Sequence, residues 1–87
     1  TPTDLFLLAQ LYAATGDRPR GRLVLSDLVR VAGQVPVYVA YYALWLLREK
    51  DLRAADEWVA RFGKLQPGTL LSAELTARLL VARHDLK

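Results

Sequence analysis

Few residues of this chain have the type and spacing that catalysis requires. Its only histidine, His84, shares a repeating position with Gly16 and Lys50, which predicts a turn between helices. Asp56 and Glu57 are adjacent, so on a helix they point in different directions and make a poor acid–base pair. The chain has no cysteine, which excludes disulfides, thiolate metal sites and cysteine nucleophiles. With neither phosphate-loop nor metal-ligand spacing, we expect no enzyme, no catalytic residue, no metal and no cofactor.

Composition indicates a small folded domain. Of the 87 residues, 53% are hydrophobic and 24% are charged, outside the range of disordered chains. The longest apolar run, Val35 to Leu47, is shorter than the roughly 20 residues of a membrane-spanning helix, so we expect a buried helix and no membrane partner. No targeting signal can be read, and arginine outnumbers lysine. These features favour a bacterial, cytoplasmic protein, although the compartment itself stays open.

Positions 34 residues apart carry similar residue types, and we call such positions equivalent. The interval joins Asp17 to Asp51 and Asp85 (51 − 17 and 85 − 51). It also joins Ala9, Ala43 and Ala77; Leu11, Trp45 and Leu79; Gly21 and Ala55; Leu28 and Phe62; Gly33 and Pro67. A sustained period of this length indicates a repeat. We therefore expect one domain, residues 1–87, with repeats at 2–35 and 36–69 and a partial third at 70–87, as a fragment of a larger protein.

Each full repeat predicts two helices. In the first, Leu5, Leu8 and Tyr12 recur at three- and four-residue steps, which is typical of an amphipathic helix, and Gly16 ends it. A second helix should begin near Pro19, because proline in a first turn costs no hydrogen bond, and end at Gly33. The remaining helices are expected at about 36–50, 52–64 and 70–83. Asp17, Asp51 and Asp85 suit the N-caps of second helices. The fold class is all-α, with five helices and no strand.

The equivalent positions resemble the tetratricopeptide repeat. That pattern has a large apolar residue, a leucine and a small residue, an aromatic residue three positions later, a small residue in the second helix and a closing proline. The matching structural positions are Ala9, Tyr12, Ala43, Leu46, Ala55, Phe62, Pro67 and Ala77. The chain departs from the pattern at Gly33, Leu46, Thr76 and Leu80. The resemblance implies a right-handed superhelical α-solenoid of antiparallel helix pairs, here about two and a half repeats.

The same resemblance implies a groove, lined by the first helix of each repeat, that binds a peptide or a partner helix. The expected groove residues are Phe6, Gln10, Ala13, Ala40, Leu44, Leu47, Arg48, Glu74 and Arg78. Arg48 could join Arg78 in holding a partner carboxylate. The family's chaperone-tail clamp uses lysine and asparagine where this chain has Phe6 and Gln10, so an apolar or mixed segment is the favoured ligand. The resulting hypothesis is a protein–protein interaction scaffold.

An RNA-binding module is the alternative, because some helical-repeat proteins of similar period read RNA. Arg18, Arg20 and Arg22 form the basic cluster that would carry this function. A nucleic-acid groove needs a continuous basic stripe, whereas each repeat here has only one more basic than acidic residue. Nucleic acid is therefore the less favoured partner.

The last expected helix raises a further question, because its Leu79 and Leu80 would lack a second helix to cover them. An uncapped terminal repeat is the weakest part of a solenoid. We expect this end either to fray or to form a weak homodimer through the uncapped C-terminal helix.

Overall fold

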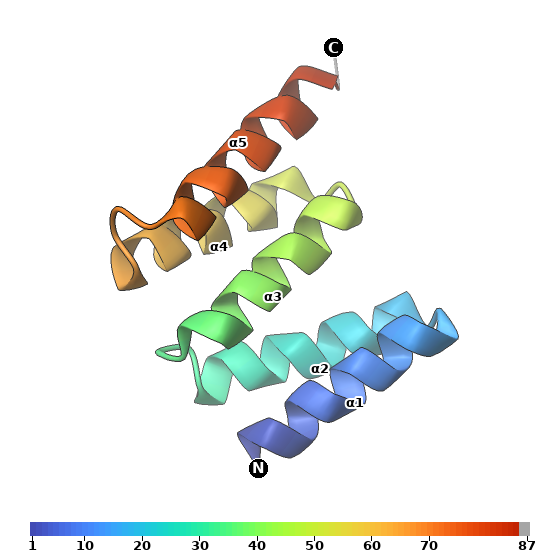
Figure 1. Ribbon diagram of the computed structural model, residues 1–87. Coiled ribbons are helices and arrows are strands. Elements are labelled where there is room, and N and C mark those ends of the chain that lie inside the picture. The colour runs from blue at the N-terminus through green and yellow to red at the C-terminus, as the bar shows by residue number, and fades with distance from the viewer. Residues whose placement is uncertain (86–87) are drawn as a thin grey trace.

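The computed structural model describes residues 1–85, which form five α-helices and contain no strand, as the sequence predicts. The helices are α1 (Pro2–Thr15), α2 (Arg18–Val31), α3 (Pro36–Arg48), α4 (Leu52–Leu65) and α5 (Leu70–Asp85). Each helix packs on the next one in the chain, and α3 also contacts α5. Figure 1 shows that they follow one another from α1 at one end to α5 at the other. None of the described helices is long and apolar enough to cross a membrane.

The helices α1 and α3 end in the same way. Gly16 (φ 81°) directly after α1 and Lys50 (φ 64°), two residues after the end of α3, adopt the left-handed conformation. The next amide then turns back to the helix: Asp17 N donates to the Tyr12 carbonyl at 2.9 Å, and Asp51 N to the Leu46 carbonyl at 3.1 Å. Such bonds satisfy carbonyls that a helix end leaves free. Two equivalent turns thus have equivalent hydrogen bonds.

Aspartates cap both second helices, which confirms the prediction for Asp17 and Asp51. Their side chains accept hydrogen bonds from the amides of Arg20 and Ala54, each at 3.3 Å. An N-cap carboxylate satisfies one of the free amides in the first turn and suits the positive end of the helix dipole. The expected cap at Asp85 lies outside the described side chains, and a following helix at Leu86 lies outside the described residues.

The end of α2 differs from the prediction, which placed it at Gly33. The helix already ends at Val31, and the amide of Ala32 donates to the Leu28 carbonyl at 2.8 Å. A Cβ atom at position 33 would instead collide with the Val29 carbonyl oxygen. Position 33 therefore requires glycine because a backbone oxygen lies close to it, and not because of a positive φ.

Small residues let the helices pack closely, as expected at three of the four alanine positions. Ala9, Ala43 and Ala55 are fully buried. Gly21 shows the constraint most sharply, since a Cβ atom there would lie 2.5 Å from Cη2 of Trp45. A glycine on α2 thus accommodates the largest side chain of α3.

The prediction was wrong for two residues of α5. Ala77 is exposed, although its equivalents Ala9 and Ala43 are buried, because the described chain contains no second helix after α5 to cover it. Leu79 is only 4% exposed, so it does not share an uncovered face with Leu80, which is 57% exposed. Leu79 faces the preceding helices, since α5 packs on both α3 and α4.

Candidate functional site

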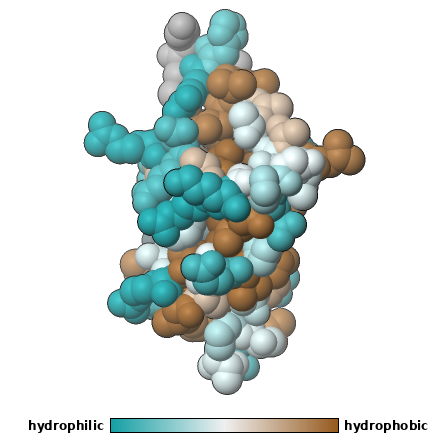
Figure 2. Space-filling model, turned by 90° about the vertical axis from the view of Figure 1, so that its left-hand side faces the viewer, coloured by the Kyte–Doolittle hydropathy of each residue, from teal (hydrophilic) through white to brown (hydrophobic). Residues whose placement is uncertain are grey.

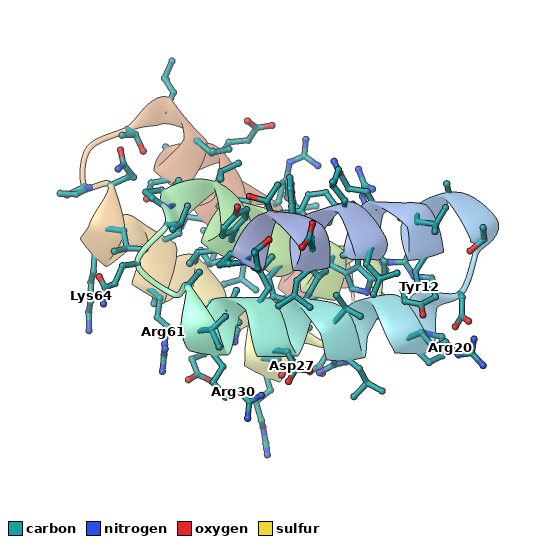
Figure 3. The ribbon with its side chains drawn as sticks, turned by 90° about the horizontal axis from the view of Figure 1, so that it is seen from below. Tyr12, Arg20, Asp27, Arg30, Arg61 and Lys64 are labelled. Carbon is teal, nitrogen blue, oxygen red and sulfur yellow. The ribbon has the colours of Figure 1, made fainter. Side chains whose placement is uncertain are left out.

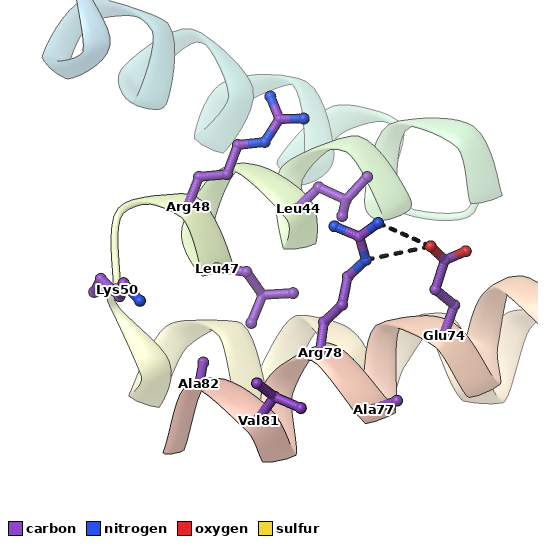
Figure 4. Close-up of a pocket in the computed structure, with 9 residues that line it drawn as sticks. All are labelled: Leu44, Leu47, Arg48, Lys50, Glu74, Ala77, Arg78, Val81 and Ala82. Atoms are coloured by element: carbon purple, nitrogen blue, oxygen red, sulfur yellow. Dashed lines mark hydrogen bonds and ion pairs between the residues drawn. The ribbon is translucent and has the colours of Figure 1, made fainter. Parts of the chain in front are cut away.

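A hollow of about 570 Å³ lies between α3 and α5 (Figure 4). Five of the nine expected groove residues line it: Leu44, Leu47, Arg48, Glu74 and Arg78. These side chains come from two helices that are not neighbours in the chain. Their convergence follows from the contact of α3 with α5, which brings equivalent faces of two first helices together.

The floor of this pocket is apolar. Leu44 is half-buried and Leu47 is 8% exposed, so α3 presents mainly the edge of the core. On α5, Val81 is 61% exposed and stands beside the exposed Ala77. An aliphatic side chain placed here would be in contact with apolar groups from both helices, and burial of such surface stabilises a complex by about 25 cal/mol per Å².

The rim of the pocket is charged, with three basic side chains and one acidic side chain. Arg78 donates from Nε and Nη2 to Oε1 of Glu74, at 3.3 and 2.9 Å, as Figure 4 shows. Both partners are 55% exposed, and such an (i, i+4) pair contributes only about 0.3–0.5 kcal/mol. Arg48 and Lys50 add positive charge at the end of α3. The rim therefore favours a ligand with negative charge.

Four lining residues are not among the nine expected groove residues: Lys50, Ala77, Val81 and Ala82. Lys50 lies at the rim because the left-handed turn after α3 holds it there. Its equivalence with Gly16 indicated the turn but not the direction of the side chain. Ala82 belongs to the buried side of α5 and reaches the pocket at its edge.

The other expected groove residues are not part of this pocket. Phe6 is half-buried, with its ring centroid 5.1 Å from those of Tyr38 and Tyr41, so it fills the α1–α3 interface. Gln10 and Ala13 are exposed on α1. Ala40 is 5% exposed and lines a second hollow of about 340 Å³ between α3, α4 and α5. Figure 2 shows hydrophobic residues among hydrophilic ones on the face that carries the α2–α3 and α4–α5 turns.

The basic cluster at the start of α2 is engaged within the chain. Arg22 Nη2 donates to Oδ2 of Asp51, and Nη1 lies 3.8 Å from Oε1 of Glu49. Arg18 Nε lies 3.9 Å from the other oxygen of Glu49, and its guanidinium stacks 4.7 Å from the Trp45 ring centroid. The hydrogen bond from Arg22, with help from the Ala54 amide, lowers the pKa of Asp51, and the same bond raises the pKa of Arg22. Two of the three arginines therefore join the first repeat to the second.

Acidic partners also accompany three exposed arginines of the second helices. Figure 3 shows Arg20, Arg30, Arg61 and Lys64 on α2 and α4, with Asp27 between them on α2. Three of these arginines pair with acids one turn away: Arg20 with Asp17 at 3.3 Å, Arg30 with Asp27 at 2.9 Å and Arg61 with Glu57 at 3.2 Å. This alternation is typical of a solvated helix face and gives no continuous basic stripe of the kind that phosphate backbones require.

The residues first considered for catalysis are separated. His84 is exposed in the last turn of α5, because that helix continues to Asp85. The predicted turn between helices at this residue is therefore wrong. Asp56 pairs with Arg83 at 2.8 Å, whereas Glu57 pairs with Arg61. The two acids thus have different partners and share no site.

Comparison with protein-family models, with curated proteins and with solved structures found no match to this chain. The interpretation of its pocket therefore depends on its own geometry and residue pattern.

Proposed function

We propose that this chain is a protein–protein interaction module that binds a partner segment in the pocket between α3 and α5. The supporting observation is the combination of an apolar floor, including Leu44 and Val81, with a basic rim formed by Arg48, Lys50 and Arg78. A volume of about 570 Å³ falls within the range of about 300–1,000 Å³ for sites that enclose a ligand group. No covalent chemistry is needed for this function.

The proposed architecture is a right-handed superhelical α-solenoid similar to tetratricopeptide arrays, in which first helices line the binding groove. Equivalent turns after α1 and α3 and equivalent caps on α2 and α4 support it. In this arrangement α5 supplies one wall of the groove and α3 the other. The occupant is a peptide or helix that places an aliphatic side chain on the floor and a carboxylate at the rim, by the groove mode of recognition.

RNA binding gains no support from the basic cluster, since Arg18 and Arg22 are held by Glu49 and Asp51. A phosphate backbone would have to displace these carboxylates before it could contact the guanidinium groups.

A display library of short peptides, selected on the immobilised chain, tests the proposal. We expect enrichment of segments with a leucine-like residue next to Asp or Glu, at affinities of about micromolar, as in small transient interfaces. Val81→Asp and Arg78→Glu should weaken the selected peptides at least about tenfold. The matched controls Leu23→Asp and Arg30→Glu change residues that are 68% and 75% exposed on α2 and should have no effect. Equal losses of peptide affinity in the pocket variants and in the control variants would contradict the proposed site.

A further inference from the structure

The helix α1 is apolar on nearly all sides, although one of its sides faces solvent. Its only charged side chain is that of Asp4. Phe6 and Ala9 face the other helices, yet Leu7 and Leu11 on the outer side are 58% and 57% exposed. A helix that is hydrophobic all round is normally buried, so the outer side of α1 has the composition of an interface.

The same three residues recur on α5, two intervals later (75 − 7, 79 − 11 and 82 − 14), where they are covered. Leu7, Leu11 and Ala14 are equivalent to Leu75, Leu79 and Ala82, and the residue types are identical at all three positions. On α5 these side chains are 0%, 4% and 9% exposed. The packing of α5 on α4 and α3 accounts for this burial. A face of identical composition is thus exposed on α1 and buried on α5.

The helix α3 uses the equivalent face in a related way. Its Trp45, equivalent to Leu11 and Leu79, is 4% exposed and packs against Gly21 of α2. The residue equivalent to Gly21 is Ala55 on α4, which is also fully buried. In both later repeats, therefore, this face meets a second helix with a small residue near its start.

We propose that the outer face of α1, formed by Leu7, Leu11 and Ala14, is a docking surface for an amphipathic helix of the α4 kind, with an alanine opposite Leu11. In a second copy of the chain, α2 and α4 cannot serve as this helix, because their small residues Gly21 and Ala55 are already buried. This surface is distinct from the α3–α5 pocket and does not depend on the function proposed for that pocket.

A fused chain tests the proposal by supplying the docking helix in a defined register. Residues 35–68 are placed ahead of Thr1, so that the fused Gly68 is as far from Pro2 as the natural Gly68 is from Leu70. The added copy of α4 can then pack on α1 as α4 packs on α5. We expect amide hydrogen exchange in the original α1 to slow at least about tenfold relative to the 87-residue chain.

Matched substitutions separate docking from a general gain in stability. Leu11→Lys should have little effect in the 87-residue chain and should abolish the added protection in the fused chain. Leu23→Lys, at a residue 68% exposed on α2, should have the same small effect in both. Equal effects of Leu11→Lys in the two chains would overturn the proposal. A dimer of the 87-residue chain that Leu11→Lys dissociates in sedimentation would also overturn it, because a second copy would then be the occupant.

Discussion

Arg83 on α5 and Asp56 on α4 form an ion pair, with Nη2 2.8 Å from Oδ2. The residues one interval earlier, Glu49 and Arg22, also pair, at 3.8 Å, with the two charges exchanged. The same two positions therefore join α2 to the end of α3 and α4 to α5 by an ion pair, with the acid and the base exchanged between the two junctions. Asp51 strengthens only the earlier junction, because it binds Arg22 and caps α4 at the same time.

Asp51→Asn should destabilise the chain by roughly 1 kcal/mol at neutral pH, because it removes a charged partner of Arg22 but keeps a side chain that can cap. Because the folded state lowers the pKa of Asp51, its contribution is present above the usual carboxyl pKa of about 3.9. It is lost as the pH falls through the lower folded pKa. Urea unfolding from pH 7 to 2 should show the two proteins converging in acid. Asp56→Asn is the control and should lower the stability by less, because its ion pair with Arg83 is 55% and 48% exposed. A stability difference between Asp51→Asn and the unmodified chain that stays constant from pH 7 to 2 would contradict this account.

Gly21→Ala should destabilise the chain by about 1–3 kcal/mol, because the new methyl group would overlap the Trp45 ring. Trp45→Leu installs the residue found at the equivalent positions 11 and 79 and makes room for that methyl group. In the double variant, the cost of Gly21→Ala should fall by at least about 1 kcal/mol, measured as a coupling energy in urea unfolding. Additive costs would show that the two side chains do not compete for space.

Lys50→Gly should stabilise the chain by about 0.5–1 kcal/mol. A lysine at φ 64° adopts a left-handed conformation that costs L-residues about 1–2 kcal/mol, and glycine avoids this cost. Lys50→Ala, which removes the side chain and keeps the backbone strain, should not give this gain. Gly16→Ala should lower the free energy of unfolding by about 1 kcal/mol, because alanine is strained at the φ of 81° that Gly16 adopts. No atom lies within 4 Å of the added methyl group, so this cost comes from the backbone and not from a steric clash. Thermal unfolding of the three variants measures these differences.

Glu74→Gln should strengthen binding of an acidic partner segment about three- to tenfold, because Glu74 competes with the ligand carboxylate for Arg78. Glu57→Gln is the matched control, since Glu57 pairs with Arg61 at the same spacing on α4. Fluorescence anisotropy with one selected peptide measures both variants. Weaker binding by Glu74→Gln would mean that Glu74 contacts the ligand directly.

Leu79→Lys should destabilise the chain by several kcal/mol, whereas Leu80→Lys should change its stability by less than about 0.5 kcal/mol. The difference follows from their exposures of 4% and 57%. Sedimentation across a dilution series checks the expected weak homodimer at the same time. If the C-terminal helix pairs with a second copy, Leu80→Lys will weaken the dimer without lowering monomer stability.

Much of the helical structure was predictable because it depends on interactions within a few residues. Pro36 begins a helix, Gly16 ends one and Asp51 caps one, and each role follows from the residue's own backbone or side-chain chemistry. Regular spacing then predicted five helices within one or two residues of their observed ends. Gly33 was misread because its constraint is contact with a neighbouring backbone oxygen, which sequence spacing does not reveal.

Only the tertiary structure decided which side chains meet across helices. Leu79 and Leu80 are neighbours of the same type in the sequence, but one faces the α3–α4 side and the other faces solvent. Likewise, the sequence alone left Arg22 available to a ligand, whereas in the structure the turn between α3 and α4 places Glu49 and Asp51 beside it. The physical reason is that a sequence periodicity identifies the face of a helix, whereas the partner of that face depends on how rigid helices pack together.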